Sequence, residues 1–324
     1  MRARRLIREV TRSGGGRSRS SPRASVCLPG QFVPAPLSVG ARPVSDPRSS
    51  FTSPFATEPT PTPAEQLALS ESESRAPFSR ADRAAAQVLI EHLFAPPAHH
   101  IDGLEYATAY RLAHGAIGGD IVDVYHFDNG DAALSIADIA GKGAQAAIHA
   151  ALVKYGLRCF ASEGLTPERV LRSLDRAYLE NNAFERTESF ASVFFAIVDK
   201  SRQAIMYASA GHEPVILIEP HAPPRRLPPT APLIGVFDDQ HHLFKQRLAE
   251  VVPGTLLLAT TDGVTEARSP HGDLFGMDRL VAAAEMLRDE PPSSIVAALM
   301  DELEDYTGGV FRDDVAMLAV RIVA

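Results

Sequence analysis

The stretch from Gly118 to Gly143 constrains the fold of this chain more than any other part of its sequence. Within it, Asp120 follows a pair of glycines, and Asp138 lies near the end of a second apolar run. Between them stands Asp-Asn-Gly-Asp, and Asn-Gly is the dipeptide that tight hairpin turns favour. We therefore expect residues 121–127 and 132–138 to form a β-hairpin. Such a hairpin holds Asp120 and Asp138 at the same end of two adjacent strands.

Two further acidic positions occur much later in the chain, again at the ends of apolar runs. Asp262 follows residues 255–261, and the pair Asp313-Asp314 precedes residues 315–320. Aspartates at strand ends that are far apart in the sequence are typical of ligands that folding brings together. Oxygen ligands without Cys or His beside them favour Mg²⁺ or Mn²⁺ over zinc. A pair of such ions can activate water for an in-line phosphoryl displacement.

The rest of the chain after residue 98 reads as separate groups of strands and helices. A helix is expected after Gly143, with Ile148, Leu152 and Tyr155 on one apolar face, and a second helix is expected to begin near Pro167. Strands that follow one another through short turns indicate mostly antiparallel sheets with helices outside them. We therefore predict one α+β domain of about 220 residues. The remaining expected elements are strands at 103–113, 190–198, 203–210, 215–219, 244–251 and 255–261, helices at 276–287 and 293–306, and a last strand at 315–322.

Charge and composition divide the chain into two parts. Residues 1–76 are rich in Arg, Ser, Gly and Pro and hold 11 Arg against 6 acidic residues, so we expect a disordered basic tail. The remainder holds 21 basic and 34 acidic residues, which argues against nucleic acid as the partner. Cys27 and Cys159 have no neighbour at disulfide or metal spacing, and no apolar run reaches the roughly 18 residues that span a bilayer. These features favour a cytoplasmic protein.

A single helix is expected between the tail and the domain. A capping-box pattern at Ser79 and an apolar stripe that ends before Pro96-Pro97 predict this helix over residues 79–94. It could pack on its own domain or pair two subunits as a homodimer. The chain then consists of a tail at 1–76, a linker helix at 77–97 and a domain at 98–324.

Five short motifs follow one another along the chain. They are Gly118-Gly119-Asp120-x-x-Asp123, Asp138-Ile139-Ala140-Gly141-Lys142-Gly143, Ala210-Gly211-His212-Glu213-Pro214, Asp262-Gly263-Val264-Thr265-Glu266-Ala267-Arg268 and Arg312-Asp313-Asp314. Together, over residues 80–324, they resemble the SpoIIE/RsbU-like branch of the PPM metal-dependent protein serine/threonine phosphatases. The chain departs from that pattern at Ile121, Val122 and Ala316, none of which is a ligand position.

The resemblance implies an αββα sandwich with two mainly antiparallel sheets flanked by helix pairs, and two Mn²⁺ or Mg²⁺ ions at one end. It implies hydrolysis of phosphoserine or phosphothreonine by hydroxide activated between the ions. The substrate it implies is a phosphorylated regulatory protein of the anti-sigma-factor antagonist type. It assigns Asp120 as the ligand that bridges both ions, and Asp138 and the backbone carbonyl of Ile139 as ligands of the first ion. It assigns Asp262 and Asp313 to the second ion, with Asp314 as the substitute for Asp313. Asp123 is a further acid that could bind metal or its water shell.

Two other residues of the motifs are candidates for substrate binding. Lys142 could contact the phosphate or cover the start of its helix. His212 could donate a proton to the leaving oxygen, whereas a loop histidine bonded to the backbone is the more frequent arrangement. Two alternatives to the protein phosphatase remain, namely a regulatory protein that keeps only the fold and a two-metal phosphohydrolase for small phosphate esters. The carboxylates are compatible with all three, and the ordered motifs favour the first.

Overall fold

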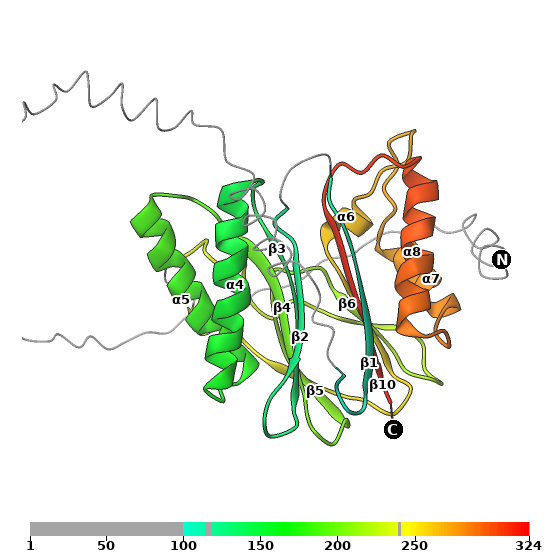
Figure 1. The fold of residues 1–324 in the computed structure, drawn as a ribbon, viewed down its shortest axis with the longest axis horizontal. Helices are drawn as coiled ribbons and strands as arrows, with labels where there is room; N and C mark the ends of the chain where they lie inside the picture. Colours follow the sequence, from blue (N-terminus) through cyan, green and yellow to red (C-terminus); the bar gives the residue numbers. More distant parts are fainter. Residues whose placement is uncertain (1–99, 114–117, 239–240, 324) are drawn as a thin grey trace, which may run out of the picture. The chain divides into compact units, whose positions relative to one another are not determined.

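The structure of the chain is a computed structural model that describes residues 100–113, 118–238 and 241–323. The tail predicted over residues 1–76 and the linker helix predicted over 77–97 lie outside the described residues. The described chain folds as two five-stranded sheets that face each other, with helices on the outer side of each sheet (Figure 1). The predicted α+β sandwich is therefore confirmed.

Both sheets are antiparallel throughout. The first sheet has the strand order β1-β10-β9-β6-β7, and the second has the order β2-β3-β4-β5-β8. The strands of the first sheet are β1 (Leu104–Arg111), β6 (Val215–Ile218), β7 (Arg225–Leu227), β9 (Leu256–Thr260) and β10 (Val315–Ile322). Those of the second sheet are β2 (Ile121–His126), β3 (Ala132–Ile139), β4 (Ala191–Val198), β5 (Ala204–Ala210) and β8 (Arg247–Glu250).

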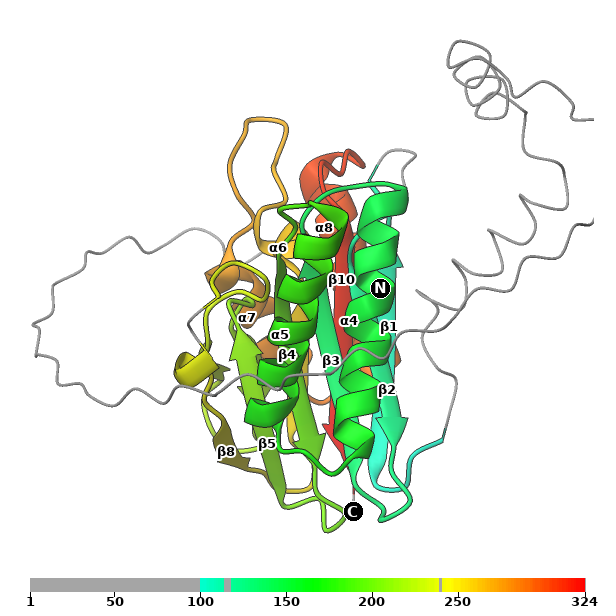
Figure 2. The ribbon, with the colours of Figure 1, turned by 90° about the vertical axis from the view of Figure 1, so that its left-hand side faces the viewer.

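Each sheet carries one pair of long helices on its outer face. Helices α4 (Ala144–Ser162) and α5 (Pro167–Glu185) lie side by side over the second sheet, as Figure 2 shows. Helices α7 (Met277–Met286) and α8 (Pro292–Thr307) cover the first sheet. Two short helices, α6 (Asp262–Thr265) and the 3₁₀ helix η2 (His241–Leu243), complete the described elements. None of the helices in the described part of the chain has the length and apolar character needed to cross a bilayer.

The hairpin predicted from Asp-Asn-Gly-Asp is confirmed. Strands β2 and β3 pair with Ile121 opposite Ala137, and the turn is closed by a hydrogen bond from the Phe127 N–H to the Asp131 carbonyl at 2.8 Å. Gly130 has φ of 92°, a backbone conformation that side chains with a Cβ atom rarely adopt. The turn chemistry therefore fixes the register that brings the two ends of the hairpin together.

Three hydrophobic clusters hold the sandwich together: one between the sheets and one beneath each helix pair. Leu134, Phe194 and Leu318 are buried between the sheets. Strands β3, β4 and β10 are apolar on both faces because one face meets the other sheet and the opposite face meets helices. This double burial explains why the corresponding segments read as continuous apolar runs in the sequence.

Helix α4 differs from the prediction in the face that it turns to the sheet. Ile148 and Tyr155, predicted on its apolar face, are 56% and 53% exposed. The residues that contact the second sheet are mostly smaller, with Ala150 and Val153 buried at the centre of the interface. Small side chains let the helix approach the strands closely, so residue size and not hydrophobicity alone decides which face is buried.

Candidate metal centre

The predicted ligands lie at the ends of strands from both sheets. Asp120 immediately precedes β2, and Asp138 is the second-last residue of β3, so the antiparallel register places them at the same end of the second sheet. Asp262 begins α6 directly after β9, and Asp313 lies two residues before β10. Because β9 and β10 are antiparallel neighbours, these two residues share one end of the first sheet.

Asp120 and Asp138 form the buried part of the site. Asp120 is only 4% exposed, and burial together with the charge of Asp138 raises its pKa well above the usual range. The two carboxyl groups share a hydrogen bond. Burial, followed by the charges of Asp262 and Asp313, raises the pKa of Asp138 to about 6. The electrostatic coupling of Asp138 to Asp262 and Asp313 shows that the acidic ends of both sheets meet.

The adjacent residues Asp313 and Asp314 have different surroundings. The Asp313 side chain is 58% exposed and forms an ion pair with Lys142, whose Nζ lies 3.0 Å from its Oδ1. Asp314 is buried, and its Oδ1 accepts a hydrogen bond from the Ala113 N–H at 2.7 Å. The Gly119 N–H is a second donor to the same carboxylate. Asp314 therefore binds backbone on both sides of residues 114–117, whereas Asp313 faces the solvent side of the site.

Glycines allow the segments of the site to approach one another. A Cβ atom at Gly119 would overlap the backbone carbonyl oxygen of Ile139, which is the oxygen predicted to bind the first ion. A Cβ atom at Gly118 would overlap the carboxylate of Asp314, and one at Gly263 would overlap the Asp314 backbone carbonyl. The glycines of the first and fourth motifs are thus required by close packing around the acidic cluster.

The donor set fits hard divalent cations. Four carboxyl groups and one carbonyl oxygen gather here, and the pKa values of Asp120, Asp138 and Asp262 are all raised, first by burial and then by the other acids. Lys142 is a cation that contacts this cluster. Across residues 100–113, 118–238 and 241–323, no three acidic, histidine or cysteine side chains form a ready-made ion-binding group. Bound cations would offset the mutual repulsion of these acids.

Asp123 lies apart from this cluster. It lies on the helix-facing side of β2, where Arg158 of α4 binds it with Nε 2.6 Å from Oδ2 and Nη2 2.8 Å from Oδ1. Lys154 lies 3.9 Å from the same carboxylate. The prediction of Asp123 as a further metal ligand is therefore not retained. Strand alternation could have shown this, because residues three apart on a strand point to opposite faces.

His212 is too deeply buried to meet a substrate in this structure. It is 1% exposed, and its Nδ1 lies 2.8 Å from the Ser192 hydroxyl. Burial lowers its pKa to about 4, so the ring is neutral near pH 7. His212 consequently packs the loop after β5, and the prediction of a substrate contact is corrected. Lys142, by contrast, lies at the exposed rim of the cluster.

Two residues near the cluster were absent from the sequence-based prediction. Thr261, the residue before Asp262, donates a hydrogen bond from Oγ1 to Oδ2 of Asp120 at 2.7 Å. Tyr110 lies close enough to Asp314 and Asp120 that their charges, after burial, raise its hydroxyl pKa. The sequence feature that could have indicated Thr261 is a hydroxyl side chain at the last position of an apolar run, directly before a predicted ligand.

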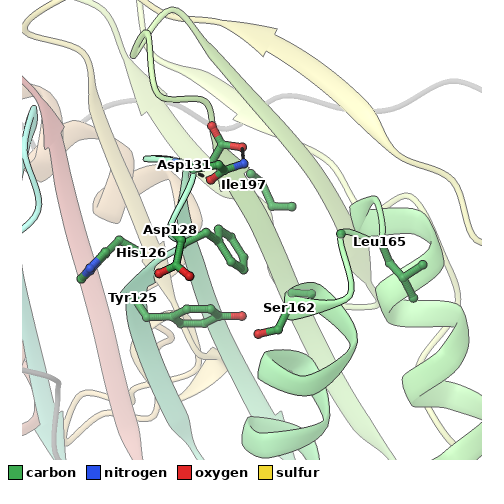
Figure 3. Close-up of a pocket in the computed structure, with 11 residues that line it drawn as sticks. Tyr125, His126, Asp128, Asp131, Ser162, Leu165 and Ile197 are labelled. Carbon is green, nitrogen blue, oxygen red and sulfur yellow. Dashed lines mark hydrogen bonds between the residues drawn. The ribbon is translucent and has the colours of Figure 1, made fainter.

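A cavity of about 450 Å³ lies at the opposite end of the second sheet (Figure 3). It is enclosed by the β2–β3 hairpin and the C-terminal end of α4, with Tyr125, Phe127 and Leu165 among its lining residues. Asp131, at its edge, accepts hydrogen bonds from Asn129 and from the Lys200 N–H, both at 2.8 Å. The hairpin turn is the far end of β2 and β3 from Asp120 and Asp138, so this cavity does not belong to the acidic cluster.

The chain is similar to known proteins over this domain. The family model for stage II sporulation protein E (SpoIIE) matches residues 128–323. The phosphoserine phosphatase RsbU of Bacillus subtilis is 28% identical over 202 residues, which make up 61% of this chain and 58% of RsbU. The chain spans between 36% and 58% of the length of the curated relatives that it matches.

Solved structures share the fold. The RsbU and RsbW domains of a Mycobacterium tuberculosis protein match with a TM-score of 0.60 and 25% identity, over 69% of this chain and 61% of that one. The catalytic domain of the serine/threonine protein phosphatase PstP, solved in complex with two manganese ions, has a TM-score of 0.52 over 68% of this chain and 99% of its own. At 14% identity, that likeness concerns the fold alone.

Proposed function

The chain belongs to the SpoIIE family, and on that premise we propose that it is a metal-dependent phosphatase that hydrolyses phosphoserine or phosphothreonine on a regulatory protein. The observation that carries the proposal is the meeting of Asp120 and Asp138 from one sheet with Asp262 and Asp313 from the other. Burial and the charges of neighbouring acids raise the pKa values of Asp120, Asp138 and Asp262, in a site whose exposed rim carries Lys142. A cluster of this kind, built from distant strand ends, is suited to bind cations and a phosphate group.

Each residue has a distinct part in this proposal. Asp120 lies between the two sheets and is suited to contact both ions, Asp138 and the Ile139 carbonyl would hold one ion, and Asp262 and Asp313 would hold the other. When bound, a pair of Mn²⁺ or Mg²⁺ ions supplies an activated water and neutralises charge on the phosphoryl oxygens. The proposal assigns Asp313 and not Asp314 to the second ion, because the carboxylate of Asp314 already accepts hydrogen bonds from the Ala113 and Gly119 N–H groups.

Lys142 is suited to orient the phosphate. Its ion pair with Asp313 is exposed, so the ammonium group can move from that carboxylate to a phosphoryl oxygen at little cost. The nearby carboxylate keeps the pKa of Lys142 raised, which favours the charged form. We propose this contact as the one that places the phosphorus atom between the acidic ends of the two sheets.

The proposed substrate is a phosphorylated partner of the anti-sigma-factor antagonist type. Support comes from the similarity to RsbU, which is named a phosphoserine phosphatase, and from that to a solved chain in which RsbU and RsbW domains occur together. Cytoplasmic location, and dimerisation through residues 79–94, stay predictions from the sequence.

The regulatory alternative gains no support from the departures at Ile121, Val122 and Ala316. Ile121 is buried beneath α4 and α5, whereas Val122 and Ala316 are buried between the sheets. These residues fill the core and leave the acidic cluster intact, so they give no reason to expect a loss of activity.

The proposal is tested by phosphate release from an aryl phosphate and from a phosphoserine peptide. The full chain is assayed with and without Mn²⁺, beside Asp262→Asn and the control Asp305→Asn, which changes an exposed acid on α8. We expect Mn²⁺-dependent release that Asp262→Asn abolishes and Asp305→Asn leaves unchanged. Turnover that persists in Asp262→Asn would rule out the assigned site.

A further inference from the structure

The hydroxyl group of Thr261 joins the two sheets at the acidic cluster. Thr261 follows β9 of the first sheet, whereas Asp120 precedes β2 of the second. Its Oγ1 donates a hydrogen bond to Oδ2 of Asp120 at 2.7 Å and accepts one from the Ala316 N–H at 3.0 Å. Thr261 is fully buried, so no water competes for its hydroxyl.

The direction of these hydrogen bonds is determined by the partners. A backbone N–H can only donate, so the Ala316 amide occupies a lone pair of the hydroxyl and leaves its single proton for the carboxylate. The backbone of Thr261 is fixed as well, because its own N–H donates to the Ala316 carbonyl at 3.1 Å and its carbonyl accepts from the Val264 N–H at 3.1 Å. The hydroxyl is thus held rigidly and points at Oδ2 of Asp120.

From this geometry we propose that Thr261 is a positioning residue that fixes Asp120 relative to the ligands of the first sheet. The inference rests on the proposed two-ion site. Asp120 and Asp138 belong to one sheet, and Asp262 and Asp313 belong to the other, so the ions require both halves in register. The bond from Thr261 spans these halves, and Thr261 is also the neighbour of Asp262 in the chain. Its loss would remove the hydrogen bond that ties Asp120 to the first sheet and would leave Asp120 bonded only to Asp138 of its own sheet, so its position would no longer be fixed relative to Asp262.

A simpler explanation is that a buried hydroxyl needs partners and finds them here. Thr255, at the opposite end of β9, allows the two explanations to be separated. It is also fully buried, and its Oγ1 accepts a hydrogen bond from the Val252 N–H at 3.1 Å. Thr255 directly precedes β9, whereas Thr261 and the acidic cluster lie at the other end of this strand. Thr255→Val therefore removes a comparable buried hydroxyl without touching a proposed ligand.

The test measures Mn²⁺ affinity by calorimetry on the full chain, with thermal melting of the metal-free protein as a check of folding. Changes to groups that orient metal ligands typically weaken binding about 10–100-fold, and we expect Thr261→Val to fall in that range. Thr261→Ser restores the hydroxyl and is expected to bind within about threefold of the wild type, which is a small fraction of that loss. Thr255→Val is expected to bind Mn²⁺ like the wild type.

Several outcomes would overturn the proposal: wild-type affinity in Thr261→Val, equal losses in Thr261→Ser and Thr261→Val, or an equal loss in Thr255→Val. If Thr261→Val does not fold, Thr261→Ala and Thr261→Ser are compared in the same way. A wild-type chain that binds no Mn²⁺ would overturn both this inference and the metal centre. Mn²⁺ binding that depends on Thr261, without any phosphatase activity, would refute the proposed function alone.

Discussion

Asp313 and Asp314 are neighbours in the chain, yet their substitution by alanine should have opposite consequences. In Asp314→Ala, the N–H groups of Ala113 and Gly119 lose a charged acceptor inside the protein. A hydrogen bond to a charged group contributes about 1.5–3 kcal/mol, and relief of repulsion between Asp314 and Asp120 offsets part of the loss. We therefore expect the free energy of unfolding of the metal-free chain to fall by about 2 kcal/mol.

Asp313→Ala removes an exposed ion pair with Lys142, and such pairs contribute at most about 1 kcal/mol. The metal-free stability of this variant should stay within that limit, whereas its affinity for Mn²⁺ should drop because a proposed ligand is lost. Both variants are compared by thermal melting in a chelator and by Mn²⁺ titration. For a domain of this size, about 2 kcal/mol corresponds to a fall of roughly 4–8 °C in Tm. Equal melting temperatures, or a larger fall in Asp313→Ala, would refute the assignment of the two roles.

Three further predictions concern the surroundings of the cluster. Because the pKa of Asp138 is raised to about 6 from an ordinary 3.8, its carboxyl group binds more protons in the folded metal-free chain than in the unfolded chain between these values, so this group contributes a rise in Tm in chelator from pH 7 to pH 5. Asp138→Asn should reduce that rise, and an unchanged pH profile would contradict the shift. Gly119→Ala should lower the free energy of unfolding by about 1–3 kcal/mol and weaken Mn²⁺ binding, because its Cβ would overlap the Ile139 carbonyl oxygen. Urea unfolding measures the first effect, and calorimetry measures the second. Arg158→Met should lower the free energy of unfolding, measured in urea, by about 3 kcal/mol, because Asp123 then stays buried with Lys154 as its remaining cation. The number of bound Mn²⁺ ions should not change if Asp123 is not a ligand.

The fold was predictable from local signals that agree with one another. Asn129-Gly130 fixed the β2–β3 hairpin, and Pro167 correctly marked the start of α5. The apolar runs around Leu257 and Leu318 became strands buried on both faces. In each case the chemistry of a few neighbouring residues determines the backbone conformation, so no long-range information was needed.

The errors concern choices that only tertiary packing decides. The stripe containing Ile148 and Tyr155 was more apolar than the face of α4 that packs on the sheet, where small residues allow closer approach. His212 was a candidate for contact with the substrate, but the loop after β5 buries its side chain.

In the candidate site, too, features set by local sequence could be predicted, whereas contacts set by tertiary packing could not. Sequence reasoning found its carboxylates because each lies at a strand end. It did not find the contact between Thr261 and Asp120, which are 141 residues apart, because no local pattern reports that the end of β9 meets the start of β2.

The most direct test of the central claim is the number of Mn²⁺ ions that the full chain binds at equilibrium. The proposed centre predicts two ions in the wild-type protein, with weaker binding in Asp138→Asn and in Asp262→Asn, since each removes a charge from a different sheet. Asp305→Asn, the exposed control on α8, should bind as the wild type does. If the wild-type chain bound no Mn²⁺ or Mg²⁺, or if both ligand variants bound two ions with unchanged affinity, the strand-end carboxylates would not form a metal centre.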